Sequence, residues 1–205
     1  MKTDIYVLFF LSFLFLVFES KAVTISPPRA HFDEGERVKV IKVNNNSKSE
    51  VAIYVDINRD KVDSDIYLTS SADEVLIPPG GSESIKLVLV GDGGKEKEAL
   101  FYVSIVELIR DVEHEGSSVN LSFENTLKAI YTPKGLGESK LEINGSKFVN
   151  TGPRYIQLLS LVCEGKDDVR NITLFEPFSE SIINEDCTVV GYKELRYGKT
   201  VIVLF

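Results

Sequence analysis

The fold class follows from the stretch VAIYVDI at residues 51–57, in which Val51, Ile53, Val55 and Ile57 occupy alternate positions. An apolar residue at every second position is typical of a β-strand with one buried face, because successive side chains of a strand point to opposite faces of the sheet. An amphipathic helix would repeat its apolar residues every three or four positions instead. The stretch therefore predicts a strand.

Similar segments continue the pattern on both sides of residues 51–57. They lie at 38–43, 75–77, 85–89, 100–106 and 119–123. Turn-forming runs, PPGG at 78–81 and GDGG at 91–94, separate some of them. Strand centres about 8–12 residues apart, without a long helical period, predict an all-β protein built as an antiparallel sandwich.

The segment PKGLG at 133–137 interrupts the strands with three breakers and is the best domain boundary. Further strand candidates follow it up to residue 204. We therefore expect a first domain at 23–133 and a second at 134–205. The second is short for an immunoglobulin-like sandwich of about 100 residues, so we expect it to be small or incomplete.

Residues 1–22 have the pattern of a secretory signal peptide. Lys2 precedes an apolar run at 5–18, and the small residues Ser20 and Ala22 precede the expected cleavage point. The run is shorter than the roughly 20 residues that a membrane-spanning helix needs, although an uncleaved anchor is the alternative. Export leads to an oxidising compartment, where Cys163 and Cys187 can form a disulfide or stay a free pair.

The net charge of −8 argues against binding to nucleic acid or to an anionic membrane surface. The two histidines, His31 and His114, have no nucleophile motif or metal-ligand spacing beside them. No glycine-rich loop ends in the Lys-Ser/Thr pair of a phosphate-binding loop. The sequence therefore predicts no enzyme activity, no cofactor and no metal site.

Several short motifs occur in a fixed order across 23–133: SPPRAHF at 26–32, Asn44, PG at 79–80, FY at 101–102 and KAIYTP at 128–133. This ordered set resembles the PapD-like periplasmic pilus chaperones, and the cysteines of the second half resemble those of the divergent alternate branch. The resemblance implies two immunoglobulin-like β-sandwich domains set at an angle. It also implies a periplasmic chaperone that binds pilin subunits by donor-strand complementation and delivers them to an outer-membrane usher, with no membrane insertion after signal cleavage.

The resemblance also implies roles for individual residues. Arg29 and Lys128 correspond to the basic pair that anchors the carboxylate at the end of the pilin chain. Val119, Leu121 and Phe123 correspond to the donor strand, whose apolar side chains fill the groove of the pilin.

Taken alone, these residues allow plainer interpretations. The alternation at 119–123 also fits a strand that fills the protein's own core, and an isolated Arg29 and Lys128 would be solvated surface charges. Thr132 stands where most family members have an arginine of an interdomain ion network, so that network is in doubt. A secreted immunoglobulin-like adhesion or structural module is the main alternative function. A secreted hydrolase would need a cluster of acid, base and nucleophile that the sequence does not show.

Overall fold

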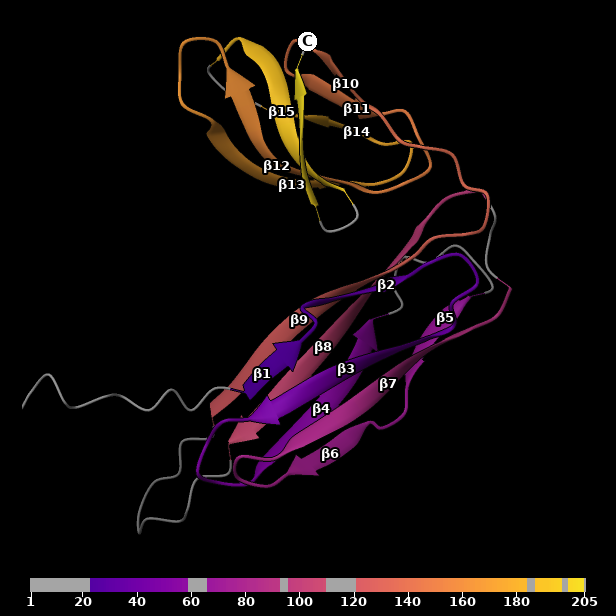
Figure 1. Cartoon of the computed structure of the whole chain (residues 1–205), viewed down its shortest axis with the longest axis vertical. Helices are drawn as coiled ribbons and strands as arrows, with labels where there is room; N and C mark the ends of the chain where they lie inside the picture. Colours follow the sequence, from indigo (N-terminus) through magenta and orange to yellow (C-terminus); the bar gives the residue numbers. More distant parts are fainter. Residues whose placement is uncertain are drawn as a thin grey trace, which may run out of the picture.

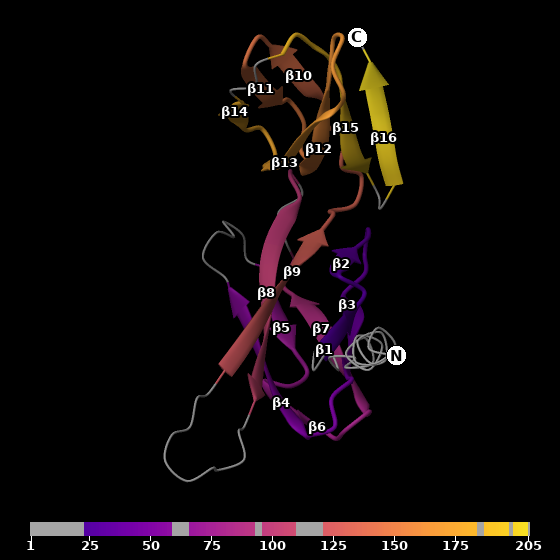
Figure 2. The same ribbon diagram turned by 90° about the vertical axis from the view of Figure 1, so that its left-hand side faces the viewer.

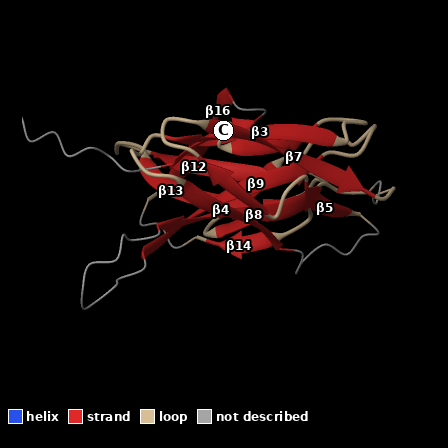
Figure 3. Cartoon of the chain, turned by 90° about the horizontal axis from the view of Figure 1, so that it is seen from below, coloured by secondary structure: helices blue, strands red, loops and turns tan. Residues whose placement is uncertain are grey.

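The computed structural model consists of β-strands arranged as two sandwiches (Figure 1). It describes residues 23–58, 66–92, 96–109, 121–183, 187–196 and 199–204. Within these ranges every regular element is a strand, as Figure 3 shows. None of the described residues belongs to a helix that is long and apolar enough to cross a membrane. The prediction of an all-β fold is confirmed.

The first sandwich contains the strands up to residue 131. They are β1 (Val23–Ser26), β2 (Arg29–Phe32), β3 (Val38–Asn45), β4 (Val51–Asn58), β5 (Tyr67–Ser70), β6 (Glu74–Ile77), β7 (Ser82–Val90), β8 (Ala99–Ile109) and β9 (Leu121–Tyr131). One sheet has the order β1-β3-β7-β5 and the other β2-β9-β8-β4-β6. The chain therefore changes sheets between β1 and β2, where the Ser26–Pro27 peptide bond is cis.

The core of this sandwich follows the alternation in the sequence. Val51, Ile53 and Val55 of β4 are buried, as predicted. In β3 the buried pair is Ile41 and Val43, whereas the even-numbered valines of that strand lie on the outer face of the sheet. The run VKVIKV at 38–43 has apolar residues at both even and odd positions, so its sequence does not determine which face of the strand is buried.

The second sandwich follows residue 140 and is the smaller one. Its strands are β10 (Leu141–Asn144), β11 (Lys147–Asn150), β12 (Ile156–Cys163), β13 (Val169–Phe175), β14 (Glu180–Ile182), β15 (Val189–Arg196) and β16 (Lys199–Leu204). They form one sheet of order β10-β11-β14 and another of order β13-β12-β15-β16. The described residues thus hold seven strands, the number in a constant-type immunoglobulin domain. The half is small, as expected, but it is not short of strands.

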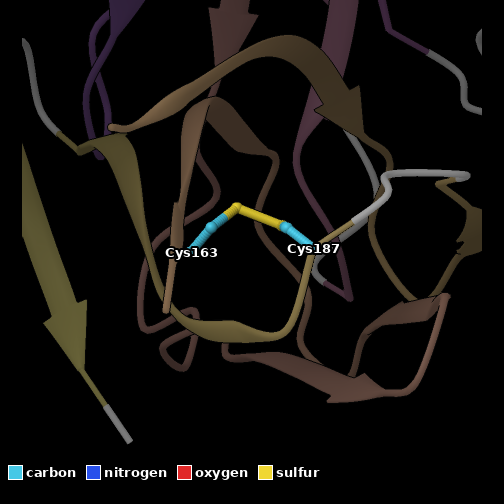
Figure 4. The surroundings of a disulfide bond; sticks show 2 residues. All are labelled: Cys163 and Cys187. Atoms are coloured by element: carbon cyan, nitrogen blue, oxygen red, sulfur yellow. A yellow bond between two sulfur atoms is a disulfide. The ribbon is translucent and has the colours of Figure 1, made fainter. Parts of the chain in front are cut away.

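A disulfide joins Cys163 at the end of β12 to Cys187, which precedes β15 (Figure 4). The two α-carbons lie 5.6 Å apart, within the range that a disulfide spans. The two cysteines are 24 positions apart in the sequence, and closing a loop of that length corresponds to about 3 kcal/mol of stabilisation in the loop-entropy description. Of the two states expected for the cysteines, the structure shows the bridged one.

Each sandwich also contains a fully buried asparagine whose side chain holds a neighbouring loop. Asn45 donates through Nδ2 to the carbonyl of Ser49 at 2.7 Å and to that of Ile77 at 3.0 Å. Asn150 donates in the same way to the carbonyls of Arg154, at 2.7 Å, and Glu176, at 2.9 Å. The second of these asparagines fixes the start of the segment that faces the first sandwich.

Candidate functional site

Residues of both sandwiches line a cleft with a volume of about 610 Å³. The first sandwich contributes Arg29 from β2 and Lys128 and Ile130 from β9. The second contributes Tyr155, just before β12, and Glu194 from β15. Figure 2 shows that β2 and the end of β9 lie at the end of the first sandwich that faces β12 and β13.

Arg29 and Lys128 are neighbours because β2 and β9 pair in parallel with these two residues as Cα partners. Leu127 and Ala129 are buried in the core on either side of Lys128, and Ala30 follows Arg29 into the same core. Strand alternation therefore turns both cationic side chains away from the core, and both of them line the cleft. The structure brings together the two cations that the sequence analysis singled out.

The cation pair has an electrostatic consequence for Lys128. Partial burial lowers the pKa of Lys128, and the adjacent charge of Arg29 lowers it further. Among the described residues, neither side chain has a carboxylate within ion-pair distance. Two cations whose N–H groups converge can donate short charge-assisted hydrogen bonds to one carboxylate. The two cations therefore form a positively charged position in the cleft that can bind an anion.

Tyr155 contributes a neutral donor on the opposite wall of the cleft. Burial raises its pKa to about 12, and the nearby groups Glu176, Tyr102 and Glu98 also favour the protonated hydroxyl. The phenol consequently keeps its proton at neutral pH and can donate a hydrogen bond. The cleft thus holds this neutral hydroxyl and the two cations, and its lining also includes Arg154 and the four acidic residues Asp33, Glu98, Glu138 and Glu194.

A buried glutamate, Glu98, connects the two sandwiches next to the cleft. Its Oε1 accepts a hydrogen bond from the Thr132 hydroxyl at 2.7 Å, and its Oε2 accepts one from the Tyr155 amide at 2.8 Å. Its own backbone amide donates to the carbonyl of Pro153 at 2.8 Å. Arg154 Nη1 lies 3.8 Å from Oε1. An interdomain network therefore exists although residue 132 is a threonine, and Arg154 of the second sandwich supplies its cation.

Arg154 is itself held by the linker between the sandwiches, residues 132–140. Its Nε donates to the carbonyl of Gly137 at 2.9 Å, and its Nη2 donates to that of Leu136 at 2.8 Å. Its backbone amide donates to Ser139 Oγ at 2.6 Å. The close approach requires a glycine at 152, where a Cβ atom would lie 2.4 Å from the Cα of Ser139. Linker, glutamate and arginine thus form one connected contact.

His31 extends this network toward the cation pair. Its Nε2 lies 2.8 Å from Thr132 Oγ1. The Thr132 hydroxyl has one proton and donates it to Glu98, so the histidine is the donor in its bond with the threonine. Because His31 lies in β2, two residues after Arg29, the interdomain contact is continuous with the strand that holds the cation pair.

The other half of β9 has an open edge. β9 pairs with β8 along its whole length, residues 121–131, but pairs with β2 only through residues 128–131. Among the described strands none pairs with the remaining edge, residues 121–127. Phe123 lies in this part and is 51% exposed. An exposed aromatic residue beside unpaired backbone groups is a template for the addition of another strand.

The structure describes only some of the residues that the sequence analysis expects in a donor strand. Phe123 is exposed and therefore does not fill the protein's own core. Leu121 is the first residue of β9 and pairs with Ile109. Val119 lies outside the described residues.

Sequence reasoning missed three buried or partly buried charged residues at the interface, namely Glu98, Arg154 and Glu194. Glu98 precedes the apolar strand β8, and Arg154 follows the Gly-Pro pair at 152–153. Neither position has a local pattern that distinguishes a buried charge from an exposed one. Glu194 alternates with Tyr192 in β15, and that period could have suggested that the two share a face.

Comparison with known proteins gives a consistent set of matches. Residues 22–137 match the model of the family described as "Pili and flagellar-assembly chaperone, PapD N-terminal domain". The chain is 24% identical over 186 residues to the chaperone protein FanE of Escherichia coli, covering 82% of this chain and 81% of that protein.

Two solved structures illustrate the likeness in fold. The periplasmic chaperone SfaE is 19% identical with a TM-score of 0.70, covering 90% of this chain and 100% of the other. A chain in the Salmonella enterica complex of the SafA pilin with the SafB chaperone is 16% identical with a TM-score of 0.71, covering 90% and 96%. These structures share the two-domain immunoglobulin-like fold with this chain.

Proposed function

Since the chain belongs to the PapD family of pilus and flagellar-assembly chaperones, we propose that it captures pilin subunits by lending them the open edge of β9. A pilin that lacks its last strand exposes an apolar groove and unpaired backbone groups, which are costly to leave unsatisfied. The donor strand completes the sheet of the pilin and fills its groove. The open edge at residues 121–127, with the exposed Phe123, is the observation that carries the proposal.

In this proposal Arg29 and Lys128 anchor the carboxylate at the end of the pilin chain. Charge-assisted hydrogen bonds fix that end in the cleft. From Lys128 to Phe123 is five residues, or about 17 Å along an extended strand. An anchor at one end of β9 therefore sets the register in which the client strand meets the apolar side chains at the other end.

The apolar donor residues Val119, Leu121 and Phe123 supply the second part of the binding energy. Transfer of such a side chain from water into an apolar groove is worth about 1.5–3 kcal/mol. Part of that gain offsets the loss of freedom on association. Cation anchor and apolar strand are thus expected to act together, one for register and the other for affinity.

The remaining features of the proposal follow from the family. The protein acts without catalysis in the periplasm, reached through a signal peptide at 1–22, and it delivers its client to an outer-membrane usher. We place the domains at 23–133 and 134–205. In support, β9 ends at Tyr131 and β10 begins at Leu141, and each side of this linker has its own hydrophobic core.

The proposal is tested by co-expression with candidate pilins from neighbouring genes and purification of a one-to-one complex. Phe123→Asp should abolish capture, because it places a carboxylate against an apolar groove. Ser122→Asp is the matched control. It adds the same charge at the preceding residue, which is exposed and lies on the other face of β9 because side chains alternate along a strand.

Circular dichroism on the same preparations separates lost capture from lost folding. If Phe123→Asp is folded and retains pilin at the parental level, the open edge is not the binding site. The secreted adhesion or structural module then becomes the better interpretation.

A further inference from the structure

A third buried glutamate, Glu107, lies within the first sandwich and does not line the cleft. It lies in β8 and is only 3% exposed. Its Cα partners are Ile53 in β4 and Phe123 in β9, and its strand neighbour on the same face is Ile105, which is also buried. The carboxyl group therefore lies at the rim of the core, beneath the open edge of β9.

The contact of this carboxyl group is with the start of β1. The backbone nitrogen of Val23 donates to Glu107 Oε2 across 3.5 Å, and Val23 is 8% exposed. Among the described residues, no lysine, arginine or histidine lies within ion-pair distance of Glu107. Burial raises the pKa of Glu107, and the bond from Val23 opposes this rise only in part. A buried carboxylate without a cation is strongly unfavourable.

Val23 is also the residue at which the mature chain is expected to begin. In the full-length chain its nitrogen is an amide with one proton to donate. Hydrolysis of the Ala22–Val23 bond consumes one water molecule and leaves a carboxylate on Ala22 and an amino group on Val23. At neutral pH much of that amino group is a protonated ammonium, because the usual pKa of an α-amino group is about 7.7–8.0.

We propose that Glu107 is the binding site for the new amino terminus, so that removal of residues 1–22 creates a buried ion pair between the Val23 ammonium and the Glu107 carboxylate. The pair links β1 of one sheet to β8 of the other. The unprocessed chain lacks the cation, and its first sandwich is correspondingly less stable. This inference rests on the cleavage proposed above but not on pilin capture, which is tested separately.

The test is a thermodynamic double-perturbation cycle on the mature, disulfide-bonded protein. Its two changes are the Glu107→Gln substitution and the acetylation of the α-amino group. Acetylation of Val23 restores an uncharged amide like that of the precursor. It is carried out on the denatured chain near pH 6.5, where the α-amino group reacts before the lysines because its pKa is lower. Peptide mass spectrometry confirms both the modification and the first residue.

In the free-amino protein, Glu107→Gln should lower the folding equilibrium constant in urea unfolding at least tenfold more than it does in the acetylated protein. Glu124→Gln is the matched control, because Glu124 is exposed on β9, and its effect should not depend on acetylation. Equal effects of Glu107→Gln in the two forms would overturn the proposal, as would a mature chain that begins at another residue.

A second measurement applies to native protein and needs no unfolding curve. The rate at which Val23 is acetylated in the folded chain should rise about tenfold in Glu107→Gln, because loss of the carboxylate lowers the pKa of the buried amine. An unchanged rate in a folded variant would show that the amino group does not pair with Glu107.

Discussion

The two ends of β9 differ although they belong to one continuous strand. At residues 128–131 the strand is paired on both sides, by β8 and by β2, and Ala129 and Tyr131 are buried. At residues 121–127 it is paired with β8 alone, and Phe123 is half exposed. The closed end is stabilised within the protein, whereas the open end keeps backbone groups and apolar surface available for another chain.

The difference shows how one strand combines stability with binding. The closed end is continuous with the contact made by Thr132 and Glu98, so it is tied to the second sandwich. It therefore provides a fixed position for the cation Lys128. The open end needs no such support, because in the proposed function the client completes it.

The largest expected effect contrasts two apolar residues on one face of β9. Leu127→Ala removes a side chain that is only 5% exposed, and it should lower the free energy of unfolding by about 2–5 kcal/mol. Phe123→Ala should change the stability of the free protein by less than about 1 kcal/mol and weaken pilin binding by about 1.5–3 kcal/mol. Urea unfolding and a binding titration measure the two quantities. A large loss of stability in Phe123→Ala would place that residue in the core instead.

A smaller effect is expected when the cation of the closed end is removed. Lys128→Ala should weaken pilin binding by about 1.5–3 kcal/mol, the value of a hydrogen bond to a charged group, and should leave the fold intact. Lys134→Ala is the control, because Lys134 is an exposed lysine beyond the end of β9. Equal affinity of the two variants would mean that no carboxylate is bound at Lys128.

The next prediction concerns the contact that fixes the closed end to the second sandwich. Glu98→Gln replaces one acceptor oxygen by an amide group, so either Thr132 or Tyr155 loses its partner, which costs about 1–3 kcal/mol. We expect the two sandwiches to unfold less cooperatively, as calorimetry can measure. Glu96→Gln, at an exposed position two residues earlier, should not change the transition. A transition in Glu98→Gln identical to that of the parent would show that the contact does not couple the sandwiches.

The smallest expected effect is the pH dependence of capture. The lowered pKa of Lys128 means that the free protein loses this charge at a lower pH than an exposed lysine would. A bound carboxylate favours the charged form and raises that pKa, so affinity is constant at neutral pH and falls as the pH rises through the pKa of the free protein.

Lys128→Arg should bind with an affinity that stays constant to higher pH, because arginine does not titrate in this range. Binding titrations between pH 7 and pH 10.5 make the comparison. If the parent and Lys128→Arg decline together, another group is responsible.

The sequence was sufficient for the all-β class and for many of the strands, but no candidate segment covered β1, β2, β5, β14 or β15. It left open whether Cys163 and Cys187 are bridged. Alternation marked the buried residues of β4, and the family resemblance implied the pairing of Lys128 with Arg29, which are Cα partners in β9 and β2.

Where apolar residues stand next to one another, the sequence did not show whether the odd-numbered or the even-numbered residues of a strand face the core. In β3 the buried face was ambiguous, so the sequence did not show that Asn45, and not its neighbour Asn44, is the buried asparagine. A shift of one residue reverses the face of a strand.

The interface between the sandwiches was not predictable for a different reason. Glu98 and Arg154 are 56 residues apart in the chain and meet only because both sandwiches are folded. The substitution at residue 132 suggested a missing ion network, because the arginine expected there was absent. Its replacement comes from the other domain, and no local pattern signals a compensation between positions so distant in sequence.

The most direct test of the proposed function is amide hydrogen exchange along β9 in the free protein and in a one-to-one complex with pilin. In the free protein, residues 128–131 should be protected from exchange and the edge amides of residues 122–127 should exchange faster, because only the former lie between two strands. Pilin binding should protect the amides at 122–127 and change those at 128–131 little. A stable complex in which residues 122–127 exchange as fast as in the free protein would contradict donor-strand capture at the open edge.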